Sequence, residues 1–317
     1  GLKKGEISTW QIGYMIAPRL NAMGRLETAL DSLRLLCTRS KKRARDLAQV
    51  LNQTNKERQE LTLSTFEHAK TLIKKVRPCV AARSVLEQKK LLFLAHESYN
   101  QGVIGLVAGK LVEEFYRPAI VIAKGRIYSK ASVRSVNGFN IIQYLRSLDG
   151  FYEDIGGHPM AAGFTVKTEK LALLQQRLED LAQKQIDQEL LKPVSWADCE
   201  IELTDITPQL FEKLKKFEPF GIGNPQPTFV SRGVQVVSFR QVGAEGRHLK
   251  LSVQGPTLQR RKVGPLTKTF DAIAFNHGDL ALKLSQGQKI DILYTIEEDT
   301  WNGNQKLQLK IKDIRML

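Results

Sequence analysis

The chain has 317 residues, 42% of them hydrophobic and 26% charged, which is typical of folded globular proteins and argues against disorder or a coiled coil. At about 150 residues per domain, this length predicts about two domains. No apolar run reaches the ~20 residues that a bilayer span needs, so we expect no membrane association. Three scattered cysteines, Cys37, Cys79 and Cys199, exclude a disulfide framework and a CxxC zinc site and favour a cytoplasmic protein.

Lys and Arg number 48 against 33 Asp and Glu, a formal net charge of +15. This excess favours a polyanionic partner such as nucleic acid, although an ordinary basic cytosolic protein fits the charge equally well. The excess is concentrated in residues 1–78, which carry 16 basic and 7 acidic side chains. The chain begins at Gly1 rather than at a methionine, and we expect it to be a fragment of a longer protein.

The first segment is predicted to be helical. Residues 6–37 fit two short helices around a loop at Pro18–Arg25. Apolar residues then recur at three- and four-residue spacings through residues 40–76, without Gly or Pro until Pro78, which predicts one long helix with Ser40 as its N-cap. At 1.5 Å per residue such a helix spans about 55 Å, a length that suits a connector between domains.

The middle segment alternates between strand and helix patterns and therefore predicts an α/β fold with helices packed on a sheet. Strands are expected at 91–95, 119–123, 129–134 and 162–166, and helices at 103–115, 138–148 and 168–188, the last capped by Thr168.

From about residue 193, short strand patterns separated by turn signals predict a small closed β-barrel, for which an OB-fold is the leading candidate. The expected strands are 198–203, 229–240, 249–253, 270–275, 289–297 and 306–314, with one helix at 208–217.

The sharpest local motif is Gly156–Gly163, which lies between a predicted helix and a predicted strand. Gly156 and Gly157 allow a close backbone approach, and His158 could donate a hydrogen bond to a phosphate or stabilise developing charge. A glycine turn with an incidental histidine is the alternative. The small residues that follow favour the phosphate-binding interpretation.

Two further patterns indicate anion binding. Ser132 and Arg134 are two residues apart on a predicted strand and therefore share a face. Arg19 and Arg25 flank the predicted loop, whose backbone amides would be exposed. A surface ion pair explains Arg134 equally well when that residue is considered alone.

The remaining histidines carry weaker signals. His96 and the segment Asn100–Gly105 follow the first buried strand, a common ligand position, but the glycines there are equally explained by close helix–sheet packing. We expect His68 to be solvated and His248 and His277 to serve packing or backbone contacts. No His/Asp cluster has metal-ligand spacing, and no GxSxG, P-loop or GxGxxG motif occurs.

Five motifs together carry a resemblance to a known family. In chain order they are Arg19–Arg25, Gln101–Ala108, Ser132–Ser135, Gly156–Gly163 and Glu218–Pro227. They resemble the C-terminal two-thirds of the RecJ family, single-strand-specific exonucleases of the DHH phosphoesterase superfamily. The resemblance implies the tail of a DHH catalytic domain at 1–38, a linking helix at 39–78, a DHHA1 domain at 79–190 and an OB-fold single-strand-binding domain at 191–317.

The resemblance also implies an activity. Family members degrade single-stranded DNA from the 5′ end with Mn²⁺ or Mg²⁺ in recombination and repair. Their metal ligands belong to the DHH domain, so we expect this chain to bind no metal and to be inactive by itself. The implied partners are single-stranded DNA and, further, a single-strand-binding protein or a helicase, and we expect a monomer.

Site residues follow from the matched motifs. The resemblance makes His158 catalytic and assigns phosphate or DNA contacts to Arg19, Arg25, Ser132, Arg134, Gly156 and Gly157. It also covers Asn55 and Arg58, whose role could be structural. On the barrel, the basic residues Arg247 and Lys250 are expected to hold the trailing single strand. The basic run 260–262 could be DNA-binding or a solvated loop, and Trp301 or Phe239 could stack on bases. One departure is Tyr99, where the family usually has Trp.

Two other functions remain open. The chain could be a non-catalytic module that binds single-stranded nucleic acid. It could also belong to a DHH-type phosphodiesterase of short oligonucleotides or cyclic dinucleotides, which the OB-like region disfavours because a small substrate has no trailing strand to hold.

Overall fold

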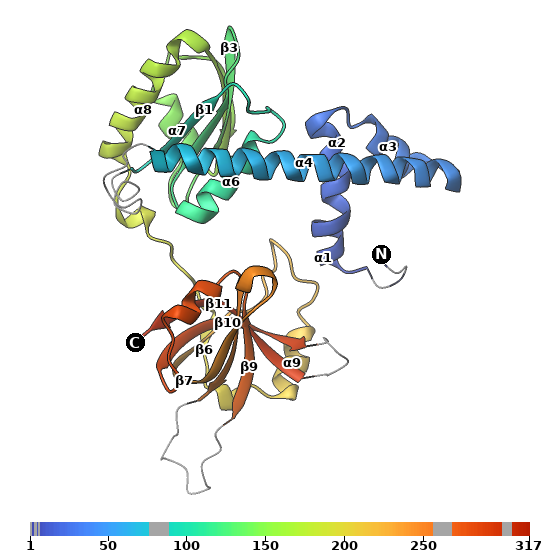
Figure 1. Cartoon of the computed structure of the whole chain (residues 1–317), viewed down its shortest axis with the longest axis vertical. Coiled ribbons are helices and arrows are strands. Elements are labelled where there is room, and N and C mark those ends of the chain that lie inside the picture. Colours follow the sequence, from blue (N-terminus) through green and yellow to red (C-terminus); the bar gives the residue numbers. More distant parts are fainter. Residues whose placement is uncertain (1, 3–4, 6, 76–88, 256–267, 300–305) are drawn as a thin grey trace, which may run out of the picture. The chain divides into compact units, whose positions relative to one another are not determined.

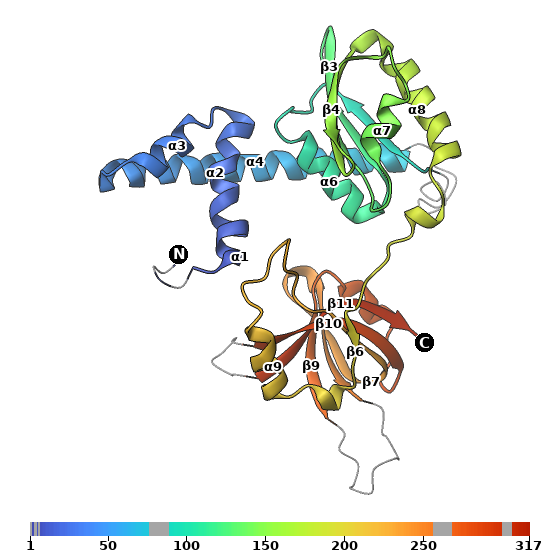
Figure 2. The ribbon, with the colours of Figure 1, turned by 180° about the vertical axis from the view of Figure 1, so that it is seen from behind.

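A computed structural model describes residues 2, 5, 7–75, 89–255, 268–299 and 306–317. The chain forms two compact units, Gly1–Pro193 and Val194–Leu317. Figures 1 and 2 show both units from opposite sides. The N-terminal helices, the long helix and the sheet all belong to the first unit, and the barrel forms the second. Among the described residues, no helix combines the length and the apolar character that a bilayer span requires.

The N-terminal helices begin with α1 (Thr9–Gln11), a π-helical stretch (Ile12–Ile16), α2 (Ala17–Leu26) and α3 (Leu30–Cys37). The predicted loop at Pro18–Arg25 is therefore wrong, because these residues form α2. Pro18 lies in the first turn of α2, where its missing N–H costs no helical hydrogen bond. Since the amides of this segment belong to a helix, they are not exposed for anion binding.

The long helix is confirmed as α4 (Lys41–Lys75), whose 35 residues span about 50 Å. The predicted cap is also confirmed, since the Ser40 hydroxyl accepts a hydrogen bond from the Arg43 amide at 3.3 Å. The second half of α4 packs against the α/β layer through Phe66, Ala69 and Ile73. Instead of bridging open space, α4 is therefore an integral part of the first unit.

The first unit contains a five-stranded mixed sheet in the order β1-β2-β3-β5-β4, in which only β1 and β2 are parallel. Its strands are β1 (Leu92–His96), β2 (Ala119–Ala123), β3 (Tyr128–Arg134), β4 (Tyr152–His158) and β5 (Ala161–Lys167). Its helices are α6 (Ile104–Phe115), α7 (Ile141–Arg146) and α8 (Leu171–Gln185).

Two details differ from the predictions. Edge strand β4 was not predicted, because only Tyr152 and Ile155 give it a partly buried apolar face. Thr168 does not cap a helix by its side chain: it starts a 3₁₀ turn, and its hydroxyl donates to the Gly125 carbonyl at 2.8 Å. The predicted α/β layer is otherwise confirmed.

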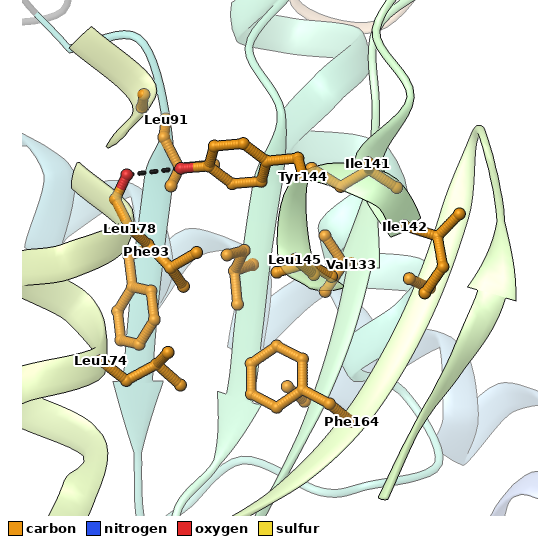
Figure 3. Close-up of a cluster of buried hydrophobic side chains, with 14 of the residues drawn as sticks. Leu91, Phe93, Val133, Ile141, Ile142, Tyr144, Leu145, Phe164, Leu174 and Leu178 are labelled. Atoms are coloured by element: carbon orange, nitrogen blue, oxygen red, sulfur yellow. Dashed lines mark hydrogen bonds between the residues drawn. The ribbon is translucent and has the colours of Figure 1, made fainter. Parts of the chain in front are cut away.

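The sheet has two apolar faces. One face packs against α7 and α8, as Figure 3 shows, and there the buried Tyr144 hydroxyl donates to the carbonyl of Leu178. The other face of β1 and β2 packs against α6, which in turn contacts α4. Because α6 also contacts β3, the helical cover on this side lies over β1, β2 and β3.

The second unit is a closed barrel in which β10 pairs with both β11 and β7. The parallel pairing of β9 with β11 completes an OB-fold, as predicted. Its strands are β7 (Phe229–Val242), β8 (His248–Gln254), β9 (Thr269–Ala274), β10 (Lys289–Asp299) and β11 (Lys306–Met316), with short β6 (Cys199–Glu200) beside β7 and helix α9 (Pro208–Lys215).

Candidate functional site

The strand register brings His158 and Arg134 onto one face of the sheet. Arg134 on β3 is opposite Ala161 on β5, and Ala161 is opposite His158 on β4. Residues opposite each other in register point to the same side, and neighbouring strands lie about 4.8 Å apart, so the two backbones are about 10 Å apart. The His158 side chain is exposed and Arg134 is half-buried. A single small residue, Ala161, separates the two.

The two neighbouring glycines of β4 differ in whether the structure requires a glycine at their position. Gly156 faces open space, because a Cβ atom there would meet no heavy atom within 4 Å. At Gly157 a Cβ atom would lie 2.4 Å from the carbonyl oxygen of Ala161, so only glycine allows β4 to approach β5. The alternative of a glycine turn is wrong for these three residues, since Gly156, Gly157 and His158 lie within β4. The motif is a hairpin with an uncovered small-residue surface.

Helix α6 packs closely over Ser132 and Arg134. A Cβ atom on Gly105 would lie 2.9 Å from the Ser132 hydroxyl and 3.4 Å from the Arg134 guanidinium. Arg134 donates to the carbonyl of Val133 at 2.9 Å and lies 3.4 Å from the Ser132 hydroxyl. Burial, followed by repulsion from Arg25, lowers the pKa of Arg134. Gly105 is therefore explained by close helix–sheet packing, which also fixes two candidate phosphate ligands.

Arg25, near the end of α2, also lies close to Arg134. Its guanidinium donates to the carbonyl of Gly102 at 3.3 Å, and its own carbonyl oxygen would be only 1.9 Å from a Cβ atom on Gly102. The end of α2 therefore rests directly on the loop before α6. Arg19 is different: it donates to Asn52 on α4 at 3.1 Å and to the carbonyl of Met15 at 2.5 Å. These contacts give Arg19 a structural role between helices.

The outer surface of the barrel carries the second group of predicted residues. Arg247 is exposed and pairs with Glu245 at 3.7 Å, and Lys250 on β8 is opposite Arg240 on β7. Phe239 is half-buried and packs against the barrel core, so the predicted stacking role does not fit it. The basic run 260–262 and Trp301 lie outside the described residues.

Sequence reasoning missed Phe275, an exposed aromatic residue directly after β9. Phe275 is 47% exposed at the end of β9, with the His248 ring 5.1 Å and the Lys310 ammonium 5.8 Å from its ring. The prediction that His248 serves packing and backbone contacts is confirmed, since it also accepts from the Asn276 amide. The alternation in β9 could have identified Phe275, because it follows buried Phe270, Ala272 and Ala274 at the outward position.

Comparisons with known proteins agree with both units. Models of the DHHA1 domain and of the RecJ OB domain match residues 88–184 and 197–313. The single-stranded-DNA-specific exonuclease RecJ of Bacillus subtilis is 33% identical over 311 residues, which cover 98% of this chain and 37% of that protein. The chain belongs to the RecJ family.

Two further RecJ comparisons support this assignment. The Escherichia coli exonuclease RecJ is 31% identical over 98% of this chain and 52% of its own length. The crystal structure of Thermus thermophilus RecJ in complex with Mn²⁺ matches with a TM-score of 0.77 and 28% identity, over 98% of this chain and 42% of that one. The chain thus spans between about a third and about half of the length of these relatives.

The RecJ relatives raise the question of metal binding. Within the described part of the chain, no three His, Cys, Asp or Glu side chains are placed to hold a metal ion. The described residues therefore do not fit the Mn²⁺ or Mg²⁺ named in the two Thermus thermophilus RecJ structures.

Tyr99, the departure noted from the family resemblance, belongs to a cluster of rings. Tyr99 is 5% exposed, and burial raises its pKa to about 12. Its hydroxyl lies 3.2 Å from Nδ1 of His68, whose ring is 4.6 Å from that of His96. The expectation that His68 is solvated is wrong, because this residue of α4 is half-buried against His96 at the end of β1. The cluster joins these two elements.

Proposed function

We propose that this chain is the DNA-holding part of a single-stranded-DNA-specific exonuclease that hydrolyses phosphodiester bonds from the 5′ end. The observation that carries the proposal is the shared face of Ser132, Arg134 and His158, beside Arg25 and an open small-residue surface. The printed names of the RecJ relatives support the same substrate and reaction.

Each residue of this face has a chemical use in holding a phosphate. Arg25 and Arg134 would bind non-bridging phosphate oxygens through charge-assisted hydrogen bonds, and the Ser132 hydroxyl would donate a further one. His158 would donate to an oxygen on which negative charge grows in the transition state. Gly156 leaves room for the sugar–phosphate backbone to lie close to β4.

We further propose that Mn²⁺ or Mg²⁺ serves the full-length enzyme through ligands outside this chain. Such a metal would supply activated water for in-line attack on the phosphodiester. We also propose that the enzyme acts in recombination and repair in the cytoplasm, as a monomer with a single-strand-binding protein or a helicase as a further partner.

The barrel has a separate proposed role, which is to grip the single strand. Phe275 offers an exposed ring for base stacking, and Lys250 and Arg247 offer positive charge for the phosphates. The β8–β9 surface that carries Phe275 and Lys250 is the one that OB-folds commonly use for oligonucleotides.

The test is His158→Ala in the full-length protein. Removing one donor to a developing oxyanion should lower kcat about 100-fold or more, while the Kd for a single-stranded substrate changes less than about twofold. Glu153→Ala, which removes an exposed side chain from the same strand, is the matched control and should leave both values unchanged. Unchanged turnover in His158→Ala would remove the proposed role of this imidazole.

A second candidate is a binding module without catalysis, favoured by the lack of a metal-binding group among the residues that the structure describes. Incubating this chain with Mn²⁺ and a labelled single strand separates the candidates for the chain itself. We expect binding without digestion. Digestion would show that the chain holds its own metal ligands.

A further inference from the structure

The side of α4 that faces α2 carries a row of polar side chains. Asn52, Asn55 and Arg58 follow one another at three-residue spacing and therefore lie near one side of the helix. Asn52 accepts a hydrogen bond from Arg19 on α2, which shows that this side of α4 meets α2. Asn55 is only 3% exposed, and Arg58 is half-buried. Such burial is unusual for an arginine without a carboxylate partner.

The Arg58 guanidinium is held by a neutral group. It donates to the side-chain oxygen of Asn55 at 2.5 Å. Among the described residues, no ion pair is found for Arg58, Arg25 or Arg134. Burial, followed by repulsion from Arg25, lowers the pKa of Arg58, as it does for Arg134. The packing of α2 on α4 and the contact of Arg25 with Gly102, before the helix that covers Arg134, place Arg25 near both of the other guanidiniums.

Arg58 on α4 and Arg134 on β3 are therefore both gathered around Arg25 at the end of α2. Placing like charges together costs free energy, and an anion between them turns this cost into attraction. The close contacts at Gly102 and Gly105 hold Arg25 and Arg134 in place, and the buried Asn55 does the same for Arg58. The region is organised before any ligand arrives, which lowers the entropy cost of binding.

We propose that Arg58, oriented by Asn55, is the third guanidinium of the anion site that Arg25 and Arg134 form, and that it contacts a backbone phosphate of the bound single strand. The inference rests on the proposed function, since it names a further residue of the same DNA-binding face. It gives α4 a direct role in binding in addition to packing, and it makes Asn55 a positioning residue.

The experiment measures binding of a 3′-labelled oligo-dT to the whole chain by fluorescence anisotropy across a salt titration. Each lost phosphate contact on a single strand lowers the slope of log K against log salt by about 0.7. We expect Arg58→Ala to lower the slope by that amount and to weaken binding about tenfold at low salt. Arg58→Lys should restore the slope without the full affinity, because it keeps the charge but not the planar fork.

Arg126→Ala is the matched control, since it removes one exposed arginine just before β3, at the opposite end of that strand from Arg134. It should leave the slope unchanged. Asn55→Asp should lower the slope as Arg58→Ala does, because the new carboxylate would compete with phosphate for Arg58.

Thermal midpoints separate a binding role from a structural one. In the binding role, Arg58→Ala leaves the midpoint unchanged or raises it, because repulsion from Arg25 is relieved. A lower midpoint with an unchanged salt slope would overturn the inference and make Arg58 a structural residue. If Arg58→Ala binds as Arg126→Ala does, the inference also fails while the proposed function stands. If the unaltered chain binds oligo-dT equally well at all salt concentrations, the proposed function fails with it.

Discussion

Two groups of cations, one in the first unit and one on the barrel, have different partners. In the first unit, Arg25, Arg58 and Arg134 donate to neutral oxygens of the backbone or of an amide side chain. On the barrel, several cations instead lie beside carboxylates: Lys310 with Glu297 at 3.0 Å, Lys215 with Glu298 at 3.4 Å, Arg232 with Glu200 at 2.9 Å and Arg315 with Asp291 at 2.5 Å. The partners therefore distinguish these three arginines from the barrel cations, although other cations of the first unit are also paired, such as Lys124 with Glu97 at 3.0 Å.

This difference suits two kinds of contact in the proposed complex with DNA. Exposed ion pairs such as that of Lys310 add little stability, but they leave less unneutralised charge to attract phosphates. The arginine cluster keeps its charge unneutralised and is suited to hold phosphate at a fixed position. The barrel offers the exposed ring of Phe275 and is suited to sequence-independent contact with bases.

The largest expected effect comes from Gly102→Ala. Its methyl group would overlap the Arg25 carbonyl and force the end of α2 away from the loop before α6. We expect a loss of about 2–3 kcal/mol in the unfolding free energy of the first unit, measured by denaturant titration, together with weaker binding of oligo-dT. Gly109→Ala is the control, since its Cβ would meet nothing within 4 Å and it should stabilise α6 by about 0.5–1 kcal/mol. Equal stability of the two variants would contradict a cluster built by close packing.

Asp291→Asn tests the ion pair that Asp291 forms with Arg315 on the barrel. Burial raises the pKa of Asp291, but hydrogen bonds from the Gly233 amide and Arg315 outweigh this and hold the pKa below its ordinary value. The depressed pKa means that the stabilisation is complete above about pH 4 and is lost as the pH falls through the folded-state pKa.

At pH 7 we therefore expect Asp291→Asn to cost the barrel about 2 kcal/mol. Thermal midpoints of both proteins from pH 7 to pH 2.5 should converge at the acid end. A difference that is independent of pH would show that the carboxylate charge is unimportant for the barrel.

Phe275→Ala tests the stacking surface directly. Loss of one base–aromatic contact should weaken oligo-dT binding about tenfold, with an unchanged salt slope because no charge is removed. Leu282→Ala removes a large exposed apolar side chain elsewhere on the barrel and should leave the affinity as it is. A reduced slope in Phe275→Ala would contradict the division between phosphate and base contacts.

The smallest effect is expected from Ser40→Ala at the start of α4. Loss of the hydrogen bond from the Arg43 amide should cost about 1 kcal/mol of stability, measured by thermal unfolding. Ser64→Ala within the same helix should cost less, because alanine is the better helix former there. Oligo-dT binding should stay unchanged in both variants, since neither residue belongs to the arginine cluster.

Much of the fold could be predicted from the sequence because its strands are short apolar runs. The prediction for β2 at Ala119–Ala123 matches the structure at both ends. Strand β4 has no such run, and the segment at Pro18–Arg25 contains Pro and Gly inside a helix. Local patterns therefore failed where tertiary contacts decide the conformation.

For the candidate site, the sequence predicted which residues take part but not how they are arranged in space. That His158 shares a face with Arg134 depends on the register of β4 with β5, which no local pattern reveals. The position of Arg58 beside Arg25 depends on how α2 crosses α4 (Figure 1). Both facts belong to packing between elements that are distant in sequence.

The continuity of α4 has a consequence for how this protein can vary. Arg58 and Phe66 lie on the same rigid rod, one at the arginine cluster and the other in the core under α6. Each residue inserted between them would turn one end by about 100° relative to the other and shift it by 1.5 Å. The number of residues between these two positions therefore sets the alignment of both ends, so an insertion or deletion there disturbs it more than a substitution on the exposed side of the helix.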